Sequence, residues 1–160
     1  MIWGMTPSIF TQVHVGLSLI GIGAGLIVMF GLLAGELRDR WITLFLATTV
    51  ATSVTGFGFP FDHLLPSHKV GIISLVILTV AIVARYGLHL AGTWRRVYVV
   101  CAAIALYLNV FVAVTQAFLK IPVLTALAPT QAEPPFAIVQ LAVLALFIAL
   151  TIVATKKPRG

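Results

Sequence analysis

Three histidines and one carboxylate are the side chains in this sequence best suited to binding a metal or a cofactor. His14, His63 and His68 lie at or between the ends of long apolar runs, and Asp62 is adjacent to His63. Imidazole and carboxylate groups suit Zn, Cu, Ni or Fe, and two imidazoles from different helices suit haem b. All four are therefore candidate metal ligands, with His14 and His68 as the candidate haem ligands. The competing interpretation is that these histidines hydrogen-bond to nearby loop carbonyls.

Two amides add to this set of candidate cofactor-binding residues. Asn109 and Gln116 share one face of an apolar run, where a buried amide needs a hydrogen-bonding partner. On an earlier run, His14, Ser18, Gly21 and Gly25 have the spacing of a single helical face. Such polar and small faces have two interpretations. They pack helices together through interhelical hydrogen bonds, or they line a polar cavity that opens outward.

The composition predicts that a membrane surrounds the elements that position these residues. The chain has 160 residues, of which 61% are hydrophobic and 9% are charged, whereas soluble proteins average about 25% charged residues. The net charge of +6 is attributed to membrane orientation, because no basic face with interleaved aromatic residues indicates nucleic-acid binding. Cys101 is the sole cysteine, which excludes an internal disulfide.

Five apolar runs are each about 20 residues long, the length that a helix needs to cross a bilayer. They cover residues 12–34, 41–61, 69–91, 97–119 and 136–156. The sequence therefore predicts an all-α fold, in which residues 1–160 form one polytopic transmembrane bundle of five helices.

The distribution of basic residues predicts the orientation of this bundle. With the N-terminus outside, eight basic residues lie inside and only Lys69 and Lys120 lie outside. The eight are Arg38, Arg40, Arg85, Arg95, Arg96, Lys156, Lys157 and Arg159. The C-terminus is then inside. The outer face holds His14, His63 and His68, together with the proline-rich connection 120–135, from which Glu133 can approach them.

The segments HVGLSLIGIGAGLIV, LFLATTVATSVTGFGFPF, LLPSHKVGIISLVILTVAIVARY and ALYLNVFVAVTQAFLKIP resemble a group of small multi-span bacterial inner-membrane proteins, known only as hypothetical proteins with no assigned activity. The likeness covers essentially the whole chain. It implies a bacterial inner membrane and one compact helical bundle, and it transfers no functional residue.

We expect a non-enzymatic membrane module that anchors or assists other subunits, or binds lipid or quinone, with its working face on the periplasmic side. Its expected partners are the bilayer, other membrane subunits or further copies of itself. A first alternative is a redox protein that holds haem b or a transition metal through its outer histidines. A second alternative is a small transporter or channel lined by Thr52, Asn109 and Gln116.

Overall fold

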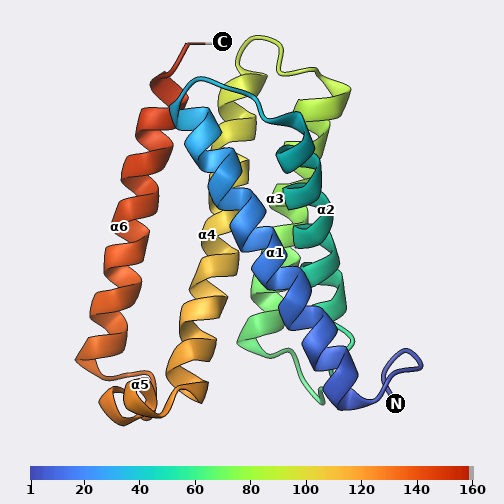
Figure 1. Ribbon diagram of the computed structural model, residues 1–160, viewed down its shortest axis with the longest axis vertical. Coiled ribbons are helices and arrows are strands. Elements are labelled where there is room, and N and C mark those ends of the chain that lie inside the picture. The colour runs from blue at the N-terminus through green and yellow to red at the C-terminus, as the bar shows by residue number, and fades with distance from the viewer. Residues whose placement is uncertain (159–160) are drawn as a thin grey trace.

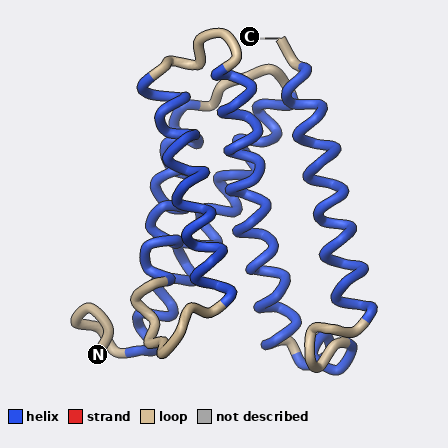
Figure 2. The backbone as a smooth tube through the Cα atoms, turned by 180° about the vertical axis from the view of Figure 1, so that it is seen from behind, coloured by secondary structure: helices blue, strands red, loops and turns tan. Residues whose placement is uncertain are grey.

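The computed structural model describes residues 1–158, which form a bundle of helices whose connecting loops lie at its two ends (Figures 1 and 2). The elements are α1 (Pro7–Leu33), α2 (Asp39–Gly56), α3 (Pro66–Ile82), the π-helical turn η1 (Val83–Gly87), α4 (Trp94–Lys120), α5 (Pro122–Leu127) and α6 (Pro134–Lys156). The predicted all-α class is confirmed for the described residues. Arg159, one of the eight basic residues assigned to the inner face, lies outside them.

Prolines fix where several of these helices begin. Pro7, Pro66 and Pro134 occupy the first helical position of α1, α3 and α6, where the missing N–H costs nothing. The Thr6 hydroxyl additionally accepts a hydrogen bond from the Ile9 backbone N–H at 3.4 Å. These starts lie a few residues before the predicted ones, because capping residues and prolines, rather than hydropathy, determine the first turn.

The predicted multi-span architecture is confirmed for four of the five runs by length and composition. Four helices are long and apolar enough to cross a membrane: α1, α3 continued through η1, α4 and α6. The predicted run 41–61 instead contains α2, which has 18 residues and ends at Gly56. This helix begins with Asp39 and Arg40 and contains five threonines and one serine, so its apolar content is below that of a typical span.

In the bundle, α1 packs mainly on α2, α3 packs on α4, and α6 packs mainly on α4. The two termini lie at opposite ends of the molecule (Figure 1). Gln140, Phe147 and Ala154 are the buried residues of α6. Because they are seven residues apart, α6 contacts the bundle along one stripe, flanked by the half-buried Val143 and Leu150, and leaves much of its remaining surface exposed.

Two glycines allow α1 to approach its neighbours closely. A Cβ atom added at Gly25 would lie 2.6 Å from Cδ1 of Leu106 on α4 and 2.9 Å from Cδ2 of Phe45 on α2. A Cβ atom added at Gly21 would lie 3.2 Å from the hydroxyl oxygens of Thr48 and Thr49. The predicted helical face of α1 is therefore confirmed as a close-packing face.

The interior divides into an apolar half and a polar half. The apolar half lies toward the C-terminal end of α1, where Leu32, Ile42, Phe45, Tyr98 and Leu106 are almost completely buried. The polar half lies toward the N-terminal end of α1, where hydroxyl, amide and imidazole groups face one another. Because apolar contacts already fix the helices in the first half, the second half is free to hold a cavity.

The third predicted span ends earlier than residue 91. The π-helical turn η1 ends at Gly87, and Leu88 N–H donates to the Val83 carbonyl at 2.9 Å. His89 and Leu90 then adopt left-handed φ angles of 50° and 57°, which reverse the chain toward α4. The buried side chain of Leu90 anchors this turn.

Candidate ligand-binding cavity

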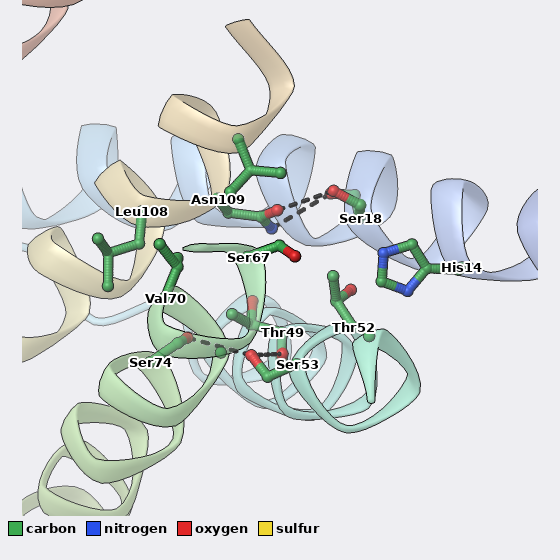
Figure 3. Close-up of a pocket in the computed structure, with 13 residues that line it drawn as sticks. His14, Ser18, Thr49, Thr52, Ser53, Ser67, Val70, Ser74, Leu108 and Asn109 are labelled. Atoms are coloured by element: carbon green, nitrogen blue, oxygen red, sulfur yellow. Dashed lines mark hydrogen bonds between the residues drawn. The ribbon is translucent and has the colours of Figure 1, made fainter. Parts of the chain in front are cut away.

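A cavity of about 100 Å³ lies between α1, α2, α3 and α4 in the polar half of the bundle (Figure 3). Its lining residues are His14, Ser18, Thr49, Thr52, Ser53, Gly56, Ser67, Val70, Gly71, Ser74, Leu108, Asn109 and Val112. Within the described chain, 1–158, this lining includes no Lys, Arg, Asp or Glu. The cavity therefore offers uncharged hydrogen-bonding groups, with apolar side chains on part of its wall.

The first wall comes from α1, where His14 points toward the space between α2 and α3 (Figure 3). Its Nδ1 atom forms a hydrogen bond with the Thr55 hydroxyl at 2.7 Å. The other ring nitrogen, Nε2, faces the cavity (Figure 3). Phe59 contacts the ring edge-on, with the two ring centroids 5.2 Å apart. These contacts fix the orientation of the imidazole and leave Nε2 available to a ligand.

The second wall comes from α4, where Asn109 is buried with 8% of its surface exposed. Ser18 Oγ donates a hydrogen bond to Asn109 Oδ1 at 2.7 Å, and Asn109 Nδ2 donates to the Ser18 carbonyl at 3.4 Å. This reciprocal pair joins α1 to α4 and satisfies a buried amide in the way that membrane helices require.

The third wall is formed by hydroxyl groups of α2 and α3. Thr52 donates to the Thr48 carbonyl at 2.8 Å, and Ser53 lies 3.0 Å from the Thr49 carbonyl and 3.1 Å from Ser74 Oγ of α3. Thr49 is only 2% exposed, and its hydroxyl has no hydrogen-bonding partner among residues 1–158. A buried hydroxyl without a partner is unfavourable, so Thr49 is the group whose hydrogen bonding a ligand would complete.

The predicted metal ligands do not converge on this cavity. Among residues 1–158, no three His, Cys, Asp or Glu side chains lie close enough together to hold a metal ion. Asp62 and His63 are exposed on the loop between α2 and α3. Glu133 accepts hydrogen bonds from Thr130 Oγ at 2.7 Å and from Thr130 N–H at 3.2 Å, and it is thus occupied with its own loop.

His68 has a structural position at the start of α3. Its Nδ1 accepts a hydrogen bond from Leu65 N–H at 3.1 Å. The ring, 3% exposed, also packs against Phe57 and Phe61 at centroid distances of 5.5 and 4.0 Å. Helix capping therefore occupies the imidazole that was predicted to pair with His14, and His68 does not line the cavity.

The two predicted amides have different positions. Asn109 lines the cavity, whereas Gln116 lies on the exposed surface of α4. The residue set Thr52, Asn109 and Gln116, predicted to line a channel, is therefore not gathered around this cavity. A different amide, Gln140 of α6, donates to the Phe111 carbonyl and to Thr115 Oγ at 3.2 Å each.

The sequence-based predictions missed the wall contributed by α3. Ser67, Gly71 and Ser74 line the cavity and are spaced by four and three residues, the pattern of one helical face. That spacing of small residues was visible in the sequence, but both serines lie within a valine-rich and isoleucine-rich helix that is otherwise typical of a lipid-facing span.

Comparison of the chain with protein-family models, with curated proteins and with solved structures gives no match.

Proposed function

We propose that this protein is a non-enzymatic membrane module that binds the uncharged polar head of an amphipathic molecule, a quinone or a lipid, in the cavity formed by α1, α2, α3 and α4. The observation that supports the proposal is the charge-free, hydrogen-bonding lining of the cavity inside a bundle of membrane-competent helices. A charged head without a counter-ion would be costly at that position, whereas carbonyl and hydroxyl groups match the imidazole, amide and hydroxyls present.

The size of the cavity agrees with a headgroup rather than a whole ligand. Pockets for drug-sized molecules measure roughly 300–1,000 Å³, whereas a cavity of about 150 Å³ is enough for benzene. A cavity of about 100 Å³ is smaller than either, so it accommodates only the polar end of a headgroup, such as one oxygen-bearing edge of a ring. The apolar tail of the ligand would remain among the exposed apolar surfaces of the helices.

We further propose that α2 crosses the membrane with the other helices, so that the N-terminus is outside and the C-terminus inside. The termini lie at opposite ends of the bundle (Figure 1). The hydroxyls of α2 bond to its own backbone carbonyls, as with Thr48 to Leu44 at 2.7 Å and Thr55 to Ala51 at 2.7 Å, which lowers their cost in a bilayer. The excess of basic residues at the C-terminal end supports that end as cytoplasmic.

With this orientation the cavity lies in the periplasmic half of the bundle. The resemblance to small bacterial inner-membrane proteins supports that membrane as the location. The partners that the proposal requires are the bilayer and the amphipathic ligand.

The test compares two glycine-to-leucine variants. A Cβ atom at Gly56 meets only His14 Cε1 within 4 Å, at 3.7 Å, so the leucine in Gly56→Leu extends into the cavity that Gly56 lines. Gly23 is an exposed residue of α1, and a Cβ atom there has no neighbour within 4 Å. Gly23→Leu is therefore the matched control.

Each protein is purified in mild detergent and extracted with organic solvent, and the extract is identified by mass spectrometry. We expect the wild type and Gly23→Leu to retain a quinone or a neutral-headed lipid, and Gly56→Leu to lose it. The mass of the extracted molecule shows whether the ligand is a quinone or a lipid. Equal retention by Gly56→Leu and Gly23→Leu would overturn the proposed site.

A further inference from the structure

The hydrogen bonds around His14 determine which of its ring nitrogens holds the proton. The Thr55 hydroxyl has one proton and two lone pairs. It donates that proton to a carbonyl of its own helix, with Ala51 O at 2.7 Å and Thr52 O at 3.1 Å. At the 2.7 Å contact with His14, Thr55 must therefore accept, and the donor must be the Nδ1–H of the imidazole. Neutral His14 then has a free lone pair on Nε2, the nitrogen that faces the cavity (Figure 3).

The neighbouring hydroxyls likewise donate their protons to other groups and present hydrogen-bond acceptors to the cavity. Ser18 donates its proton to Asn109 Oδ1, and Thr52 donates its proton to the Thr48 carbonyl. Each of these oxygens keeps lone pairs for a further contact. The side of the cavity formed by His14, Ser18 and Thr52 therefore accepts hydrogen bonds and has few protons to donate.

A cation is a poor match for this acceptor-rich wall, although cations are attracted to lone pairs. The cavity lining within residues 1–158 contains no carboxylate, and an unpaired positive charge is costly at membrane depth. An uncharged hydroxyl group supplies the missing donor without that cost.

From this pattern we infer that the ligand presents a hydroxyl group to His14 Nε2, so that the site prefers a hydroquinone, or the free hydroxyl of a lipid head, to the corresponding quinone or ester. This inference rests on the proposed function and adds that the site recognises a hydrogen-bond donor on the ligand. Thr49, whose hydroxyl has no partner among the described residues, supplies a donor on another part of the wall for a second ligand oxygen. Thr55 acts as a positioning residue, because it fixes the tautomer of His14 without contacting the ligand.

The first experiment uses two probes that differ by two hydrogen atoms, a decyl-substituted p-benzoquinone and its hydroquinone. Binding to the protein in lipid nanodiscs is measured anaerobically by isothermal titration calorimetry, with empty nanodiscs as the reference for partitioning into lipid. We expect the hydroquinone to bind about five- to tenfold more tightly, the effect of one net hydrogen bond.

The second experiment tests the tautomer through Thr55→Val, which removes the acceptor of the Nδ1 proton and lets either ring nitrogen hold it. We expect the preference for hydroquinone to be lost, because the site then has no fixed acceptor at Nε2, while both probes still bind. Thr79→Val is the matched control, because the Thr79 hydroxyl bonds only to the Leu75 carbonyl of its own helix. It should keep the wild-type preference. Nitrogen-15 NMR of the histidine rings, assigned with His14→Gln, should show a protonated Nδ1 in the wild type.

The outcomes separate this inference from the proposed function. Equal binding of the two probes, or tighter binding of the quinone, overturns the hydroxyl preference and leaves the proposed function intact. If neither probe binds, diacylglycerol and its acetylated analogue are compared in the same assay. A preference for the free hydroxyl supports the inference with a lipid as the source, whereas no binding of either lipid overturns both proposals.

Discussion

Close packing at Gly25 gives a stability prediction that can be worked out from the structure. A Cβ atom there would lie 2.6 Å from Leu106 Cδ1 and 2.9 and 3.0 Å from two ring atoms of Phe45. Both neighbours are 1% exposed, so neither has free space into which to move. Gly25→Ala should therefore overpack the core, at a cost of about 1–3 kcal/mol.

Gly23→Ala serves as the matched control for this prediction. Gly23 lies on the same helix, and a Cβ atom there has no neighbour within 4 Å. Both substitutions gain the same helix propensity, about 0.5–1 kcal/mol, so that term cancels in the comparison. The difference between the two variants isolates the steric term of about 1–3 kcal/mol.

The assay is thermal unfolding of each variant in the same detergent, followed by circular dichroism. For a chain of this length the difference corresponds to about 2–12 °C in melting temperature, with Gly25→Ala the lower. Melting temperatures that agree within error would refute the packing of α1 against Leu106 and Phe45. Reversible unfolding in SDS provides an independent measurement of the same difference.

Three further predictions concern the polar groups and the topology. Ser18→Ala should lower the unfolding free energy by about 1 kcal/mol, because Asn109 Oδ1 loses its donor; a loss no larger than that of Thr79→Val would contradict this. Reporters fused after Leu37 and after Asp62 should report opposite sides of the membrane if α2 crosses it, and the same side if it does not. Hydrogen bonds, chiefly from the Thr130 hydroxyl, hold the pKa of Glu133 below its usual range. Because the folded-state pKa is the lower one, the stabilisation is complete above the unfolded pKa of about 4.3 and is lost as the pH falls through the folded value. The amide resonance of Thr130 should report this titration, and a midpoint at or above the usual Glu value would contradict it.

The membrane helices could be predicted from the sequence because a helix needs an apolar run of about 20 residues to cross a bilayer. α1, α4 and α6 lie close to their predicted ranges, and the small-residue face containing Gly21 and Gly25 followed from spacing alone. The predicted run 41–61 does contain a helix, α2, but that helix is less apolar than the four membrane-competent helices. Its threonines satisfy their hydroxyls on the backbone of the same helix. Window-based hydropathy does not detect that compensation.

The site could be predicted only in part, because it depends on how side chains are used after the helices pack. His14 and Asn109 were correctly singled out, and both line the cavity. His68 is equally polar and follows the cavity-lining Ser67 in the sequence. Its ring nevertheless accepts a hydrogen bond from Leu65 N–H at the start of α3. Neither this choice of partner nor the free hydroxyl of Thr49 is encoded in a local pattern that spacing can reveal.

The stripe by which α6 contacts the bundle has a consequence for the order of events during synthesis. Every residue that lines the cavity precedes Ala113, and α6 begins at Pro134. Because chains emerge from the ribosome N-terminus first, α1 to α4 are available to associate before α6 has left the ribosome. The walls of the cavity can therefore be complete while the protein is still a nascent chain.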